Sequence, residues 1–155
     1  MGYTDYIGKR DVTIDAKHRV NIPAQFRKIM AEENVSEVVI SRALDSKHLD
    51  IFPLPMWIKI RDRITDSMQL MNRTHRNVLR RLTQDAIHCK LDSQGRVMLT
   101  PDLMQLAGIE DGNTVRIIGV SSFMEMWNPD ILKEHEENTP LTDDIYEKLE
   151  DVPLI

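Results

Sequence analysis

Residues 14–29 read IDAKHRVNIPAQFRKI, and residues 91–106 follow the same pattern as LDSQGRVMLTPDLMQL. The offset between them is 77 residues, and the matched pairs are Asp15 with Asp92, Arg19 with Arg96, Val20 with Val97, and Ile22 with Leu99. Self-similarity at a fixed spacing is the signature of a duplicated structural unit. The sequence therefore predicts two copies of one unit in a single chain.

The repeat continues downstream and divides the chain into four segments. Residues 37–40 match 114–117, and with a small change of offset residues 49–52 match 124–127. The predicted segments are a first unit at 7–53, a helical linker at 54–86, a second unit at 87–132 and an acidic tail at 133–155. A unit of about 45 residues buries too little surface to be stable alone, so we expect the copies to pair about a pseudo-two-fold axis.

Each unit has the pattern of strand, turn, strand, helix, strand, strand. Apolar and polar residues alternate around Val12 and Val20, which is the period of a half-buried strand. In the second unit Thr100 is a good helix N-cap, Pro101 suits the first helical position and Gly108 suits the end of the helix. The two intervening turns, at residues 16–18 and 93–95, are expected on the surface.

The linker is predicted to form two helices. Apolar residues recur at helical spacing from Trp57 onward, and Asn72 can cap a second helix. In that second helix Arg73, Arg76 and Arg80 fall on one face, opposite Leu82 and its apolar neighbours. This basic face is a rival DNA surface, although such faces are more often solvated or in contact with a neighbouring subunit.

Charge and composition narrow the functional classes. The chain has 155 residues, a net charge of -5 and one cysteine, Cys89, which fits a reducing compartment. The segment 133–155 carries eight acids and two lysines, so the remaining residues sum to +1. A mildly basic body permits phosphate binding. The N-terminus lacks the apolar run of a signal peptide, and no stretch is long enough to span a membrane.

The repeated Asp-x-x-x-Arg motif, followed by an apolar-Pro helix start, resembles the motif of AbrB/SpoVT-type swapped-hairpin domains. Two such units around a two-helix linker resemble the MraZ family over about residues 7–132. The linker motifs FPLPMW at 52–57 and Asn72, Arg76 and Arg80 are similar to those of the family. One departure is His18, which stands where the family usually has glycine.

The resemblance implies an α+β fold, mainly β, in which two pseudo-symmetric swapped-hairpin AbrB-like units are joined by a two-helix linker. It also implies ring-like homo-oligomers and a cytoplasmic, nucleoid-associated protein. The implied activity is transcriptional regulation, mainly repression of the division and cell-wall gene cluster, through short direct repeats in promoter DNA. No cofactor, metal or small-molecule substrate is expected.

The first turn supplies the candidate DNA-binding residues. Arginine can bind guanine N7 and O6 together, or a phosphate, so we expect Arg19 to make the key base contact. Lys17 and His18 would contact phosphate or neighbouring bases, and Lys9 and Arg10 the DNA backbone. A two-stranded ribbon and its turn are narrow enough to enter the major groove.

Each of these residues also has a structural interpretation. Asp15 and Asp92 are expected to brace their turns by capping backbone N–H groups and pairing with Arg19 and Arg96. Arg96, with Gln94 beside it, is a secondary candidate for DNA because the second turn is less basic, and it can act as a brace or a subunit contact. Arg76 and Arg80 in the linker helix are the other secondary candidates.

Other functional classes are less well supported by the sequence. The histidines are scattered without metal-ligand spacing, and neither a phosphate-binding glycine loop nor a nucleophile motif is present. A protein-interaction module is the main alternative, either an antitoxin-like chain whose acidic tail wraps a toxin or a purely structural ring. The tail can also be solvated, dock on a neighbour, or screen the basic surface until DNA displaces it.

Overall fold

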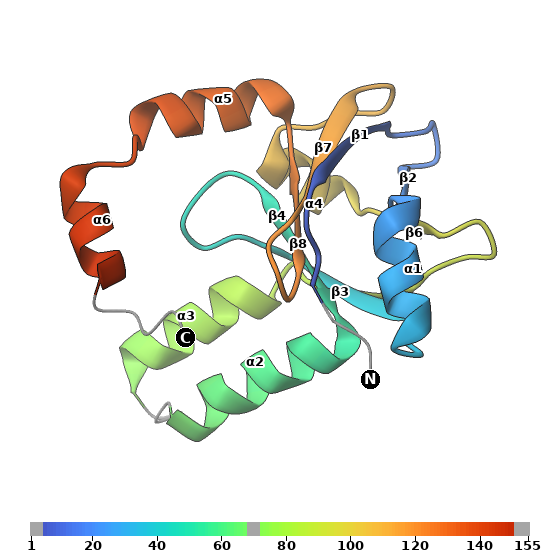
Figure 1. Cartoon of the computed structure of the whole chain (residues 1–155). Coiled ribbons are helices and arrows are strands. Elements are labelled where there is room, and N and C mark those ends of the chain that lie inside the picture. The colour runs from blue at the N-terminus through green and yellow to red at the C-terminus, as the bar shows by residue number, and fades with distance from the viewer. Residues whose placement is uncertain (1–4, 68–71, 151–155) are drawn as a thin grey trace.

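A computed structural model describes residues 5–67 and 72–150 (Figure 1). Residues 151–155 of the predicted tail lie outside this range. The elements are, in chain order, β1 (Lys9–Thr13), β2 (Arg19–Asn21), α1 (Ala24–Glu32), β3 (Glu37–Arg42), β4 (Leu49–Pro53), α2 (Leu54–Ser67), α3 (Arg73–Thr83), β5 (Ile87–Lys90), β6 (Arg96–Met98), α4 (Pro101–Ala107), β7 (Thr114–Gly119), β8 (Met124–Trp127), α5 (Pro129–Asn138) and α6 (Asp143–Glu150).

The predicted order of elements is confirmed in both units. β1, β2, α1, β3 and β4 form the first unit, and β5, β6, α4, β7 and β8 repeat that order. The α4 helix has the predicted signals: the Thr100 side chain accepts a hydrogen bond from the Leu103 N–H (3.2 Å), and Gly108 ends the helix with φ 64°. In the first unit α1 follows Pro23 without a side-chain cap.

The two units exchange strands, which confirms the swapped-hairpin fold class. A six-stranded sheet has the order β1-β7-β8-β4-β3-β5, so the first strand of each unit pairs with the third strand of the other. β2 and β6 pair separately as a short antiparallel ribbon. The pseudo-two-fold axis therefore relates β8 to β4 in the sheet and β2 to β6 in the ribbon.

The hydrophobic core lies where the duplicated residues meet. Val20 and Ile22 are fully buried, and their counterparts Val97 and Leu99 are each 2% exposed. Phe26 of α1 and Leu103 of α4 are also fully buried in the same cluster. Because buried residues of both units belong to this one cluster, the two units share a single core.

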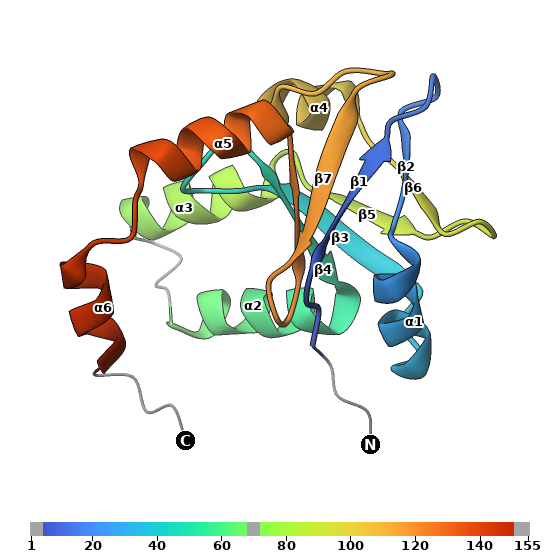
Figure 2. The same ribbon diagram turned by 45° about the horizontal axis from the view of Figure 1, so that its top comes forward.

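The predicted linker helices are present as α2 and α3. Asn72 caps α3 by accepting a hydrogen bond from the His75 N–H (3.2 Å). Leu82 is buried, whereas Arg73, Arg76 and Arg80 are exposed, as their separation on the helical wheel predicts. Figures 1 and 2 place α2 and α3 at the side of the molecule opposite the turns that precede β2 and β6.

The C-terminal segment adds two helices. These are α5 and α6, which lie one after the other at the end of the described chain. Asn128 accepts a hydrogen bond from the Asp130 N–H (2.9 Å), and Pro129 occupies the first helical turn of α5. None of the helices in the described ranges is both long and apolar enough to span a membrane.

Candidate nucleic-acid interface

The two Asp-x-x-x-Arg turns have the same hydrogen bonds. In the first turn Asp15 Oδ1 accepts the backbone N–H groups of Lys17 (2.9 Å) and Arg19 (2.8 Å), and Oδ2 accepts Nε of Arg19 (2.7 Å). In the second turn Asp92 accepts the equivalent three bonds, from the backbone of Gln94 and Arg96 (both 2.9 Å) and from Arg96 Nε (2.8 Å). Each aspartate thus braces its turn and holds its arginine.

These bonds stabilise the ionised form of the aspartate in both turns. For Asp92 the backbone hydrogen bond from Arg96 holds the carboxyl pKa below its usual range. Desolvation raises the pKa of Asp15, but hydrogen bonds from the backbone and side chain of Arg19 outweigh it and lower the pKa. Because each arginine is held through Nε, its two terminal nitrogens remain for a phosphate or a base edge.

The arginines lie on the outer face of the ribbon. In the register of β2 and β6, Arg19 is opposite Met98 and Asn21 is opposite Arg96. Successive side chains of a strand point to opposite faces, so these four residues share one face. Val20 and Val97 occupy the other face and are buried. We call Arg19, Asn21, Arg96 and Met98 the ribbon face.

The residue before each arginine has a left-handed backbone. His18 has φ 63° and Gly95 has φ 76°. The His18 Nδ1 atom lies 2.6 Å from Oδ1 of Asp111, in the loop that follows α4. The His18 ring is therefore attached to the second unit through one nitrogen, and only Nε2 remains for a nucleic acid.

The remaining first-unit candidates are not gathered in one place. Lys17 is exposed in the turn beside the ribbon face, and Gln94 has the same position in the second turn. Lys9 and Arg10 are exposed on β1, but as neighbours in a strand they point to opposite faces. Lys9 lines a groove together with the acids Glu136 and Glu137 of α5.

The α3 arginines form a separate surface. Arg76 and Arg80 are exposed, and Arg80 donates a hydrogen bond from Nη1 to Oδ1 of Asn77 (2.9 Å). In both views α3 lies on the far side of the molecule from the two turns (Figures 1 and 2). The structure therefore separates these residues from Arg19 and Arg96.

Two ribbon-face residues were missed by the sequence interpretation. Asn21 is exposed, and Met98 is 57% exposed, which is high for a methionine in a strand. The alternation of polar and apolar residues around Val20 and Val97 marks both positions as outward-facing. Their proximity to the arginines depends on β2 pairing with β6, and each strand read alone does not show that pairing.

A buried polar cluster joins β4 and β8. Nε2 of His48 lies 3.1 Å from both Asp50 Oδ1 and Glu125 Oε2, and its Nδ1 lies 2.7 Å from Ser46 Oγ. The side chains of His48, Asp50 and Glu125 lie close enough together to hold a metal ion. Burial lowers the pKa of His48, but hydrogen bonds with the two carboxylates outweigh burial and raise it to about 9. The protonated His48 ring thus supplies a positive charge beside the carboxyl groups of Asp50 and Glu125, where a metal ion would otherwise be needed.

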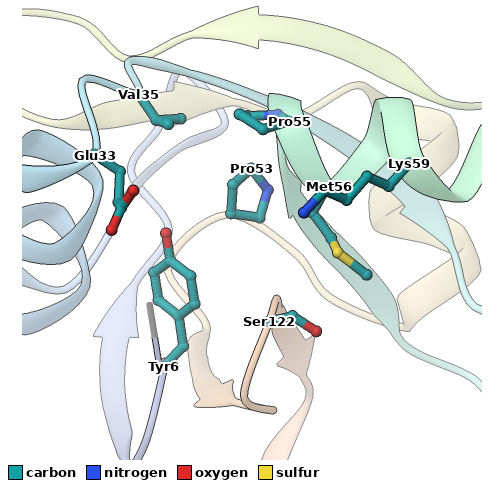
Figure 3. Close-up of a pocket in the computed structure, with 8 residues that line it drawn as sticks. All are labelled: Tyr6, Glu33, Val35, Pro53, Pro55, Met56, Lys59 and Ser122. Carbon is teal, nitrogen blue, oxygen red and sulfur yellow. The ribbon is translucent and has the colours of Figure 1, made fainter. Parts of the chain in front are cut away.

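A cavity of about 330 Å³ lies between the start of α2 and the end of α1 (Figure 3). Tyr6, Pro53 and Met56 line its apolar part, with Glu33 and Lys59 at its edges. Burial and the charge of Glu33 raise the pKa of Tyr6 to about 12, so its hydroxyl stays protonated at neutral pH. The candidate DNA-binding residues do not line this cavity.

Comparison with known proteins places this arrangement in a family. A family model described as "MraZ protein, putative antitoxin-like" matches residues 6–81 and again residues 82–145. The chain belongs to the MraZ family. Each of the two matched segments of this chain contains one braced turn and one strand of the ribbon.

Individual MraZ proteins are similar over most of their length. The chain is 33% identical over 149 residues to the "Transcriptional regulator MraZ" of Thermoanaerobacter sp. (strain X514), covering 96% of this chain and 99% of that one. The protein of the same name from Herpetosiphon aurantiacus is 34% identical, covering 79% and 80% of the two chains. That of Serratia proteamaculans is 30% identical, covering 95% and 98%.

Proposed function

We propose that this protein is a sequence-specific regulator of transcription that binds double-stranded DNA through the ribbon face and its two turns. The observation that carries the proposal is the pair of braced, half-buried arginines, Arg19 and Arg96, on the outer face of the ribbon. A two-stranded ribbon fits a major groove about 12 Å wide. The names of the similar proteins support a role in transcription.

The biological setting is proposed from the family. The protein would be cytoplasmic and nucleoid-associated, would not be an enzyme, and would mainly repress the division and cell-wall gene cluster by binding direct repeats in its promoter. The units at 7–53 and 87–132 would supply the DNA contact. The linker at 54–86 would join the two units, and the tail at 133–155 would form an acidic surface that does not contact DNA.

Oligomerisation gives this proposal a physical basis. One ribbon buries little surface on DNA, so a single subunit should bind weakly. A ring of subunits on tandem repeats would turn the second and later contacts into intramolecular events, and effective concentration would then raise the affinity. Direct repeats suit such a ring because each repeat meets an equivalent ribbon.

The test is fluorescence anisotropy of wild type and Arg19→Ala on promoter DNA from upstream of the protein's own gene, across a salt series. We expect wild-type binding to be sequence-selective and to weaken with salt, because phosphate neutralisation releases counterions. Arg19→Ala should lose selective binding while the oligomer stays intact by size-exclusion chromatography with light scattering.

A matched control removes the same charge from the opposite side of the molecule. Arg76→Ala changes the exposed face of α3, so it should retain the selectivity of wild type. If Arg76→Ala lost selective binding and Arg19→Ala kept it, the α3 face would be the DNA surface and the ribbon proposal would be wrong.

An antitoxin-like interaction module is the second candidate. It is favoured by the description of the matching family model and by the partly helical acidic tail. The same titration separates the two candidates, because a well-folded wild type without selective DNA binding would support the interaction module.

A further inference from the structure

The ribbon face has a symmetric backbone and asymmetric side chains. β2 and β6 are related by the pseudo-two-fold axis, and each begins with a braced arginine. Two residues further along, β2 has Asn21 and β6 has Met98. Arg19 therefore faces a thioether across the ribbon, whereas Arg96 faces an amide.

Asn21 is equipped for base readout. A side-chain amide has one acceptor and two donors, which can bind adenine N6 and N7 together in the major groove. Its side chain is exposed, and among the described residues it makes no side-chain hydrogen bond. It also lies directly opposite Arg96, whose guanidinium suits guanine or phosphate.

Met98 offers a different kind of contact. Its side chain is 57% exposed, whereas that of the neighbouring Val97 is only 2% exposed. An exposed apolar group on a polar ribbon is suited to pack on the C5-methyl group of thymine, which marks A·T pairs in the major groove. Methionine fits such contacts because it is flexible and polarizable.

We propose that Asn21 and Met98 are specificity-determining residues, with Asn21 recognising adenine and Met98 the methyl group of thymine. This inference rests on the proposed DNA-binding function. Because the two strands then prefer different bases, the ribbon has a direction on the operator. An oriented contact matches sites that repeat head to tail, whereas a symmetric ribbon would favour a palindromic site.

The test combines protein variants with modified bases in the promoter fragment that wild type selects. Each thymine in one repeat is replaced singly by uracil, which lacks the methyl group, and each adenine by 7-deazaadenine, which lacks N7. We expect one uracil position to weaken wild-type binding about 2- to 5-fold, as the loss of one buried methyl group predicts. One deazaadenine position should weaken binding about 5- to 150-fold.

The variants assign these effects to residues. Met98→Ala should bind thymine and uracil fragments equally, whereas Met98→Leu should still discriminate between them because an apolar side chain is kept. Asn21→Asp replaces the amide donors by acceptors of the same size. It should lose the dependence on adenine N7 and shift its preference at that base pair towards cytosine, whose N4 donates.

Two results would overturn the inference. One is a uracil effect that persists unchanged in Met98→Ala, and the other is a deazaadenine effect that persists unchanged in Asn21→Asp. Either would leave the proposed function intact if wild type still binds selectively through Arg19. If wild type has no selective binding to natural DNA, the proposed function itself fails before the analogues are used.

Discussion

The first turn of this protein carries Lys17 and His18, whereas the second turn carries Gln94 and Gly95 at the same two positions. The aspartate and arginine on either side are the same, and so are the hydrogen bonds between them. The bonds that form the turn are thus present in both copies. The positions that differ are those that the turn presents to solvent or to the opposite unit.

A second comparison, between the ends of β4 and β8, gives the same result. The His48 ring stacks on Trp127 with centroids 4.1 Å apart, and at the matching place Phe123 lies 5.1 Å from Phe52. Both copies keep an aromatic pair, but only one ring can be protonated. Duplication has therefore kept the packing and allowed the chemistry to diverge, so asymmetric positions are the ones to test.

The largest expected effect is a pH dependence of the free energy of unfolding that comes from His48. Its pKa is raised from an ordinary value of 6.5 to about 9, so the folded state binds this proton more tightly than the unfolded state. The stabilisation is complete below pH 6.5 and is lost as the pH rises through about 9. The expected loss in free energy of unfolding is about 3 kcal/mol.

Urea denaturation of wild type at pH 6.5, 8 and 10 measures this effect. His48→Phe gives the first unit the residue that the second unit has at this position, and its stability should lack this component of the pH dependence. An equal loss of stability between pH 6.5 and 10 in both proteins would show that His48 is not its source.

The second expected effect concerns the glycine of the second turn. At Gly95 an added Cβ would lie 2.2 Å from Arg27 Cδ, and the backbone is left-handed. Arg27 donates a hydrogen bond from Nε to the Ile22 carbonyl (2.8 Å), so its displacement has a further cost. We expect Gly95→Ala to lower the free energy of unfolding by about 2–3 kcal/mol, from backbone strain and the lost bond.

Gly112→Ala is the matched control for strain alone. Gly112 has φ 82°, but an added Cβ would meet no atom within 4 Å. It should therefore cost only the left-handed backbone, about 1 kcal/mol. Equal losses in the two variants, measured by thermal and urea unfolding, would show that Arg27 moves away at no cost and that the second turn tolerates a side chain as the first does.

Sequence patterns predicted the backbone better than the interface. The caps at Thr100 and Asn72 and the alternation around Val20 are local signals, so the elements that they define could be predicted. α5 was missed although Asn128 and Pro129 are a recognisable helix start. The contacts of His18 with Asp111 and of Gly95 with Arg27 join residues far apart in the chain, and nothing local indicates them.

The smallest expected effect exchanges the charges of the two turns. If the first turn contacts phosphate through Lys17, Lys17→Gln should weaken DNA binding a few-fold and reduce the slope of log K against log salt by about 0.9. Gln94→Lys should have the opposite effect only if the second turn also approaches DNA. Neither substitution touches the core, because both side chains are exposed.

A smaller slope for Lys17→Gln and an unchanged slope for Gln94→Lys would mean that the ribbon tilts towards its first turn on DNA. Equal and opposite changes would mean that both turns lie against the phosphates, with the asymmetric row of Asn21 and Met98 between them.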